Sequence, residues 1–252
     1  ASNCAFFMGQ SATKQRAEHS KKTGVFALHD ERLMSFPEKV LKISGLRVLT
    51  IEGCSLSSLP KDFTRIAPAL KQLSLARNSL KSFPEPGAFV MLETLDLHDN
   101  SLKDLPERGW ERLERLTKLI LGGNKLRALP AGLGNCQKLQ LLDASNNHLE
   151  SVPPQLATCG ELVDLELSTN QISLLPTELS GLRKLRRLHL SSNRIGSLPE
   201  ELLTSTPVEK ILVDGNPIVL EDQPGFEAYN GRRVQCIDKQ LETGGSKIRL
   251  GL

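Results

Sequence analysis

Leucine recurs along this chain at fixed distances from an asparagine, in the order L-x-x-L-x-L-x-x-N-x-L-x-x-L-P. The asparagine position is filled by Asn78, Asn100, Asn124, Asn147, Asn170, Asn193 and Asn216. The spacings between them are 22, 24, 23, 23, 23 and 23 residues. A period of this length is typical of a solenoid, in which each repeat forms one coil and stacks on its neighbours.

Within each repeat, the L-x-L step has the alternation of a short strand with one buried face, as in Leu95 and Leu97. Beyond the asparagine, a Leu-Pro or Phe-Pro pair recurs. Its prolines are Pro60, Pro84, Pro106, Pro130, Pro153, Pro176 and Pro199. Proline has no N–H and cannot occupy a central strand. The pair therefore predicts where the chain leaves the sheet and crosses the outer side of the coil.

The recurring asparagine predicts a structural role. The chain turns sharply after the strand, and this turn leaves backbone N–H and C=O groups unpaired inside the coil. A side-chain amide carries both donors and an acceptor, so it can satisfy these groups. We expect the asparagines to form a ladder and to take no direct part in binding.

Two weaker repeats precede the regular ones. In the first, Phe26 and Leu28 lie on the strand and Glu31 takes the asparagine position, and in the second Cys54 takes it. Nine repeats then extend from about residue 23 to about residue 223. We expect a flexible basic tail over 1–22, the solenoid over 23–223, and a capping helix with a short tail over 224–252. The helix is predicted within "FEAYNGRRVQCIDKQL".

The repeat resembles the leucine-rich repeat, and "LPxxLxxLxxL" after the strand phrase is similar to its typical intracellular subclass. The resemblance covers about four-fifths of the chain. It implies an α/β fold, a right-handed horseshoe-shaped solenoid with parallel strands on the concave face and irregular or 3-10 turns on the convex face. It also implies a protein that binds other molecules.

Cysteine usage favours a reducing, intracellular compartment. The five cysteines form no C-x-x-C pair, and no N-x-[ST] sequon occurs. We expect Cys136 and Cys159, which share one position in adjacent repeats, to be small buried hydrophobic residues. No apolar run approaches the length of a membrane span. The short "CAFFM" segment lacks the basic residues that precede a signal peptide core.

The segment "MGQSATK" matches the pattern for N-myristoylation, with Gly9 as the acceptor and Thr13 in the hydroxyl position. Acylation needs a free amino group on Gly9, so we expect Met8 to be the initiator and residues 1–7 to be additional. Residues 1–22 hold Lys14, Arg16, Lys21 and Lys22 against Glu18. Basic residues add to membrane binding by a single acyl chain. The alternative is a solvated tail with a chance match.

The two ends of the chain carry a narrower resemblance. "MGQS" followed by "KKTGVFAL" and "LMSFP", and the ending "VDGNPIVLEDQPGFEAYNGR", are similar to the leucine-rich repeat-containing protein 57 family. The match departs at Ala228, which stands before Tyr229 where that family has glycine. The resemblance implies a cytoplasmic, myristoylated adaptor without catalytic activity.

Strand alternation also assigns the residues of the concave face, because outward positions of successive repeats lie side by side. The central outward positions are acidic or small, with Asp99 and Asp164 beside them. We predict partner-binding residues at Asp96, His98, Ile120, Asp143, Glu166, His189 and Leu212. A basic or mixed protein surface would fit them. The alternative is a face that is polar only for solubility.

Other chemistry is poorly supported. The chain has no phosphate-binding loop, H-E-x-x-H or G-x-S-x-G, so we expect no catalytic residues, no metal and no cofactor. The basic cluster Arg183, Lys184, Arg186 and Arg187 lacks interleaved aromatics, and we expect Glu178, Glu200 and Glu201 to offset it. Nucleic-acid binding is therefore not predicted. We expect a monomeric scaffold or adaptor at a membrane surface. A soluble regulatory subunit of a phosphatase or a Ras-type GTPase complex is the alternative.

Overall fold

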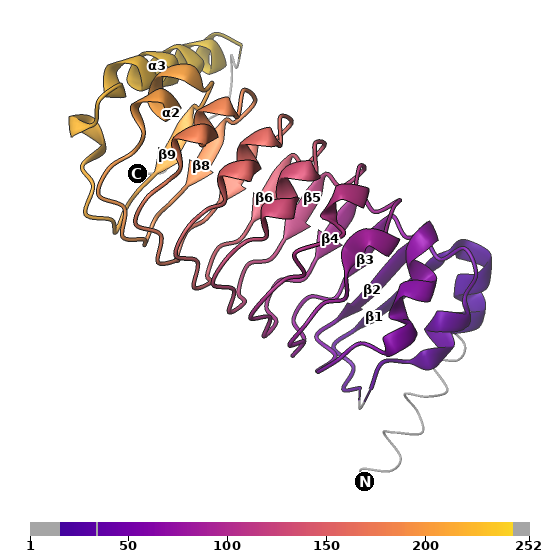
Figure 1. Cartoon of the computed structure of the whole chain (residues 1–252). Helices are drawn as coiled ribbons and strands as arrows, with labels where there is room; N and C mark the ends of the chain where they lie inside the picture. The colour runs from indigo at the N-terminus through magenta and orange to yellow at the C-terminus, as the bar shows by residue number, and fades with distance from the viewer. Residues whose placement is uncertain (1–15, 34, 244–252) are drawn as a thin grey trace.

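The computed structural model describes residues 16–33 and 35–243. Within these ranges, nine parallel strands form one open sheet in chain order (Figure 1). The strands are β1 (Val25–His29), β2 (Val48–Glu52), β3 (Gln72–Ser74), β4 (Thr94–Asp96), β5 (Lys118–Ile120), β6 (Leu141–Asp143), β7 (Asp164–Glu166), β8 (Arg187–His189) and β9 (Lys210–Leu212). β1 and β9 lie at the two ends of the strand order, so each has one free edge.

The opposite side of each coil consists of short helices. The 3-10 helices are η1 (Glu38–Lys42), η2 (Lys61–Ala69), η3 (Pro86–Ala88), η4 (Trp110–Arg112), η5 (Ala131–Asn135), η6 (Pro154–Thr158), η7 (Thr177–Gly181) and η8 (Leu220–Asp222). Proline directly precedes η5, η6 and η7, as the sequence predicts for the point where the chain leaves the sheet. The last full repeat instead forms an α-helix, α2 (Glu200–Ser205), which buries Leu202 and Leu203.

The core is a column of leucines that runs the length of the solenoid, between the sheet and the short helices. The asparagines border this column and form the predicted ladder. Asn124 donates from Nδ2 to the carbonyl oxygens of Leu121 in its own repeat and Leu97 in the previous one, both at 2.9 Å. Its Oδ1 accepts from the N–H of Leu102 at 3.0 Å. Each such amide ties two coils together and satisfies buried backbone groups.

The sharp turn after each strand has a common backbone form. The residue before the asparagine takes a left-handed conformation, with φ 51° at Asp99, 68° at Gly123 and 55° at Thr169. Only glycine adopts this conformation without steric cost, and a β-branched residue such as Thr169 is strained there. Stacking against both neighbouring coils therefore fixes a local geometry that the individual residues do not prefer.

The N-terminal end differs from the predicted flexible tail. Residues 16–23 form a helix, which falls within the segment predicted as a tail over 1–22. Ala17 and Ser20 are buried against the first coil, because their spacing of three residues places them on one face of the helix. Arg16 also forms an ion pair with Glu31. These contacts hold the helix on the first repeat.

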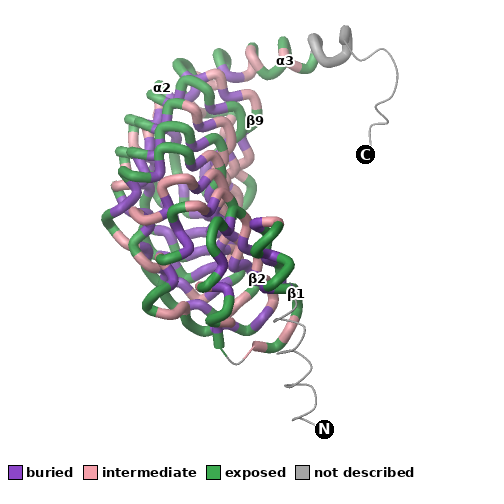
Figure 2. Tube along the Cα trace, turned by 90° about the vertical axis from the view of Figure 1, so that its right-hand side faces the viewer, coloured by how far each residue is buried: buried purple, intermediate pink, exposed green. Residues whose placement is uncertain are grey.

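At the other end, α3 (Phe226–Thr243) occupies the segment in which the sequence predicts a helix. Tyr229 is buried at its start, and the N–H of Ile211 on β9 donates to the Tyr229 hydroxyl at 3.1 Å. Further along, α3 leaves the body of the solenoid (Figure 2), and Val234 and Ile237 are exposed. The start of α3 therefore closes the last coil, and its later turns do not.

The cysteines in the middle of the chain are buried in the core. Cys136 and Cys159 are free thiols, and burial raises the pKa of each to about 12. Their sulfur atoms lie near the carbonyl oxygens of Trp110 and Leu133, respectively. The prediction of small buried hydrophobic residues is confirmed, since such thiols stay protonated and pack like aliphatic groups.

Candidate functional site on the concave face

The predicted partner-binding residues lie along one side of the sheet, and we call them the concave strip: Asp96, His98, Ile120, Asp143, Glu166, His189 and Leu212. Five of these positions occupy successive strands in direct register, from Asp96 beside Ile120 to Glu166 beside His189. Leu212 continues the same row beside His189. Parallel pairing of identical repeats is the cause, because it places equivalent residues about 4.8 Å apart.

The strip begins with a carboxylate that is already paired on one side. Asp96 Oδ1 lies 2.7 Å from His98 Nδ1 and accepts from the backbone N–H of His98 at 3.1 Å. His98 Nε2 lies 4.0 Å from Asp99 Oδ2. The pairing fixes the orientation of both side chains. Among the interactions of the described residues, none occupies Asp96 Oδ2, which is left for a partner.

A shallow apolar spot follows on the next two strands. Ile120 is half-buried and stands between Asp96 and Asp143 in the register row. Asp143 Oδ1 accepts from the Ser145 hydroxyl at 2.7 Å and from its N–H at 2.9 Å. Beside Ile120 in the neighbouring column is Gly122, where an added Cβ would lie 3.0 Å from Ser145 Oγ and 3.2 Å from Asp143 Oδ1. The Asp143 carboxylate and the Ser145 hydroxyl therefore lie close against the Gly122 backbone, and Ile120 is the apolar residue between Asp96 and Asp143 in the register row.

In the half of the strip that contains Glu166 and His189, more of the side-chain oxygens already form hydrogen bonds within the protein. Glu166 Oε1 accepts from the N–H of Ser168 at 3.0 Å, and its Oε2 lies within hydrogen-bond distance of His189 Nδ1. His189 Nε2 is buried without a partner among the described residues. Both oxygens of Glu166 are thus occupied. Glu166 positions His189 and offers less to a partner than Asp96 or Asp143.

The charges beside the strip differ from the sequence expectation. Asp164, expected to add negative charge, is paired with Arg187, and the hydrogen bonds that the guanidinium donates to Asp164 raise the pKa of Arg187. Lys184 pairs with Glu161 and Arg186 with Glu209. Three of the four basic side chains are therefore paired, with acidic residues of the neighbouring repeats rather than with the expected Glu178, Glu200 and Glu201.

Three further points concern metal sites, membrane-spanning helices and the predicted acylation site. The described residues contain no group of three or more histidine, cysteine or acidic side chains placed to hold a metal ion. None of the helices that the structure describes is both long enough and apolar enough to cross a membrane. Gly9, the predicted acylation site, lies outside the described residues.

Comparison with known proteins agrees with this geometry. Residues 91–149 and 137–195 match the Leucine rich repeat family. The nine-stranded open sheet with 3-10 turns extends the same architecture beyond the matched residues. The chain is a leucine-rich-repeat solenoid.

Several solved structures share the solenoid. A leucine-rich-repeat protein of Leptospira interrogans is 27% identical with a TM-score of 0.72, over 76% of this chain and 49% of that one. The ectodomain of the Arabidopsis thaliana receptor kinase GASSHO1/SCHENGEN3 is 29% identical with a TM-score of 0.66, over 73% of this chain and 23% of that one. The leucine-rich-repeat part of FLRT2 is 25% identical with a TM-score of 0.66, over 77% and 61%. This chain spans about half the length of the Leptospira protein.

Proposed function

We propose that this solenoid is a non-catalytic scaffold that binds a basic segment of a protein partner on the concave strip. The observation that carries the proposal is the half-buried Ile120, which has Asp96 on one side and Asp143 on the other in the register row. Each of these carboxylates has one oxygen engaged internally and the other available. A lysine or arginine can lay its aliphatic stem on Ile120 and direct its charge to either carboxylate.

The comparisons support this class of function. Leucine-rich-repeat folds commonly serve as protein-interaction modules, and proteins with this fold are typically non-catalytic. The GASSHO1/SCHENGEN3 ectodomain was solved in complex with CASPARIAN STRIP INTEGRITY FACTOR 2, and FLRT2 in an octameric complex with Latrophilin 3 and Unc5D. The concave surface of this chain fits the same use, since its parallel strands offer a long row of side chains.

The test is charge reversal at the two carboxylates that flank Ile120. We expect Asp96→Lys with Asp143→Lys to weaken binding of a captured partner by about 10- to 100-fold, because two charge-assisted contacts become repulsive. Glu178→Lys on η7, on the opposite side of the coil, is the matched control and leaves binding unchanged. Affinity capture from cells followed by titration of the isolated partner measures the effect. If the double variant captures the same proteins with the same affinity, the strip is only a solvated face.

We further propose that the protein is cytoplasmic and is held at a membrane surface by N-myristoylation of Gly9. The support is the M-G-x-x-x-[ST] pattern at Met8, the basic residues that follow it, and the similarity of the chain ends to the leucine-rich repeat-containing protein 57 family. One acyl chain binds membranes only marginally, so the basic residues are needed as a second signal.

Intact-mass measurement tests the anchor. Protein expressed from Met8 together with an N-myristoyltransferase is expected to gain the mass of one myristoyl group, and Gly9→Ala is expected to gain none. Flotation with vesicles that contain anionic lipid then reports membrane binding. An unmodified Gly9 in a competent cell would favour the alternative, a soluble regulatory subunit of a phosphatase or a Ras-type GTPase complex.

A further inference from the structure

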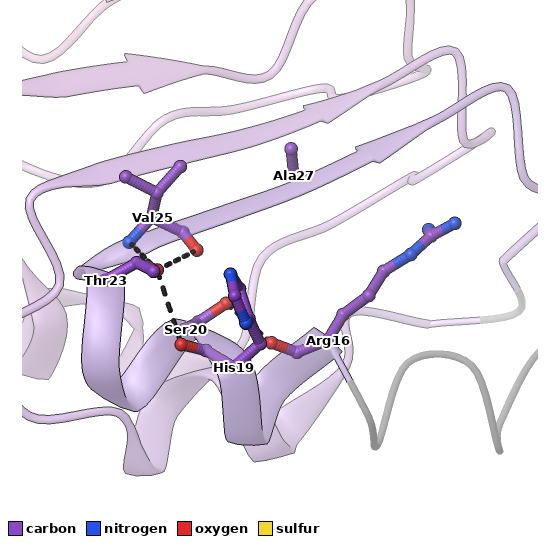
Figure 3. Close-up of a pocket in the computed structure, with 6 residues that line it drawn as sticks. All are labelled: Arg16, His19, Ser20, Thr23, Val25 and Ala27. Atoms are coloured by element: carbon purple, nitrogen blue, oxygen red, sulfur yellow. Dashed lines mark hydrogen bonds between the residues drawn. The ribbon is translucent and has the colours of Figure 1, made fainter.

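A separate feature of the surface lies at the N-terminal end of the sheet, away from Ile120 and its two flanking carboxylates. A groove of about 610 Å³ runs between β1 and the helix formed by residues 16–23. Figure 3 shows the helix alongside the strand, with Thr23 close to Val25 and Arg16 toward the other end of the strand. We call this space between the helix and the strand the β1 groove. Its lining residues are Arg16, His19, Ser20, Thr23, Val25 and Ala27.

The backbone of β1 presents N–H and C=O groups to this groove that have no partner among the described residues. Gly24 and Asp30 bond to β2, since the Gly24 carbonyl accepts from Val48 and the Asp30 N–H donates to Glu52. In a strand, alternate residues direct their N–H and C=O to opposite sides. The odd-numbered residues therefore face away from β2. At Val25 both groups bond to the Thr23 hydroxyl, at 3.3 and 3.4 Å.

At Ala27 and His29 the same side of the strand has no further strand beyond it, because β1 is the end of the described sheet. An exposed strand edge with N–H and C=O groups in sequence is a template for an added strand. β1 has five residues, which corresponds to roughly 17 Å of extended chain. The groove beside it supplies room for that chain, with a helix on its outer side.

The side chains of the groove indicate the chemistry of the occupant. Val25 is 43% exposed and Ala27 is also exposed, so an aliphatic side chain of the occupant can cover both. The helix carries Arg16, Lys21 and Lys22, and the acidic residues beside them are Glu31, which pairs with Arg16, and Glu18, which pairs with Lys21. Arg47 of the next repeat lies at the same end, where its Nη2 donates to the Thr23 carbonyl at 3.1 Å. This distribution of charge favours an acidic segment.

We propose that the β1 groove binds an extended peptide segment in which acidic and aliphatic residues alternate, and that this segment adds a strand to the free edge of β1. The acidic side chains face the basic helix and the aliphatic ones cover Val25 and Ala27. A second copy of this chain fits less well, because it would bring two basic helices together at one edge. The chain's own residues 1–15 contain no acidic residue, so they lack the matching charge.

Amide hydrogen exchange on the full chain, followed residue by residue by NMR, tests the proposal with a seven-residue peptide of alternating glutamate and valine. We expect the peptide to slow exchange at Ala27 and His29 by about tenfold or more. The same peptide with lysine in place of glutamate should bind about fivefold more weakly. A version with a central proline, which lacks the N–H needed in the ladder, should not protect these amides.

Variants separate the groove from other exposed apolar positions. Ala27→Glu places a bulky negative side chain in the groove and should abolish peptide binding, whereas Leu174→Glu, at an exposed leucine outside both proposed sites, should not change it. His19 is exposed on the helix. His19→Glu should weaken binding of the glutamate–valine peptide by about threefold and strengthen binding of the lysine–valine peptide.

Three results would overturn the proposal. Protection of Ala27 and His29 without peptide that grows with protein concentration would show a second copy on this edge. Protection without peptide that is independent of concentration would show residues 1–15 in the groove. Fast exchange at both amides at saturating glutamate–valine peptide would show that the edge accepts no strand.

Discussion

The two ends of the solenoid cover the free edges of their terminal strands in different ways. Both β1 and β9 lie at a free edge of one sheet, and both are flanked by a helix. At β9, the Tyr229 hydroxyl accepts the N–H of Ile211, and the Tyr229 ring is buried against the last coil. At β1, Thr23 satisfies only Val25, and the groove stays open beyond it.

This difference separates stability from binding. A repeat protein must cover its terminal coils, because each coil is stabilised by its neighbours and an end coil has only one. The C-terminal end meets this need with a large buried aromatic side chain. The N-terminal end covers its core with the small residues Ala17 and Ser20 and leaves part of the strand edge free. We call Tyr229, which covers the last coil, the plug. We call the helix at 16–23 the cap, which covers the first coil and leaves the β1 groove open.

The largest effect should come from removing the plug. Tyr229→Ala removes a buried aromatic ring and is expected to lower the free energy of unfolding by about 3–5 kcal/mol. Chemical denaturation measures the loss, and hydrogen exchange should show that β9 and α2 open before the central strands. A loss spread evenly over all repeats would mean that Tyr229 does not act as a local plug.

The cap at the other end should tolerate damage better. Ala17→Asp introduces a carboxylate on the buried face of the N-terminal helix, and we expect a loss of about 1–3 kcal/mol because the helix can detach from the first coil. Exchange should then rise over β1 and leave β9 unchanged. A loss as large as that of Tyr229→Ala would remove the difference between the two ends.

The sequence predicts the middle of the molecule better than its ends. The leucine period and the asparagine position each recur in successive repeats, so each repeat is separate evidence for the same geometry. This redundancy is why the register row from Asp96 to Leu212 and the ladder through Asn124 follow from spacing alone. The helix at 16–23 has no second copy in the chain. Its signal is weaker, since it consists of Arg16, His19, Ser20 and Thr23 at helical spacing.

In the candidate site, the sequence predicts which face a residue lies on but not its hydrogen bonds. Periodicity places Asp96, Asp143 and Glu166 on one face, but it does not say which oxygen is already bonded. The distinction depends on short side-chain contacts, such as Ser145 to Asp143 and His189 to Glu166. It also depends on the close approach of Asp143 and Ser145 to the Gly122 backbone, which leaves no room there for a side chain. Charge alone therefore overstates the negative character of this surface, as the pairing of Asp164 with Arg187 demonstrates.

The smallest effect isolates one hydrogen bond at the plug. Tyr229→Phe keeps the buried ring and removes only the hydroxyl that accepts the N–H of Ile211. We expect the free energy of unfolding to fall by about 0.5–1.5 kcal/mol, with exchange at the Ile211 amide faster by up to about tenfold. Ala27, whose N–H faces the open edge of β1, serves as the internal reference and should exchange at an unchanged rate. If Ile211 in this variant exchanges as slowly as before, the ring alone covers the edge of β9, and the two ends differ in packing rather than in hydrogen bonding.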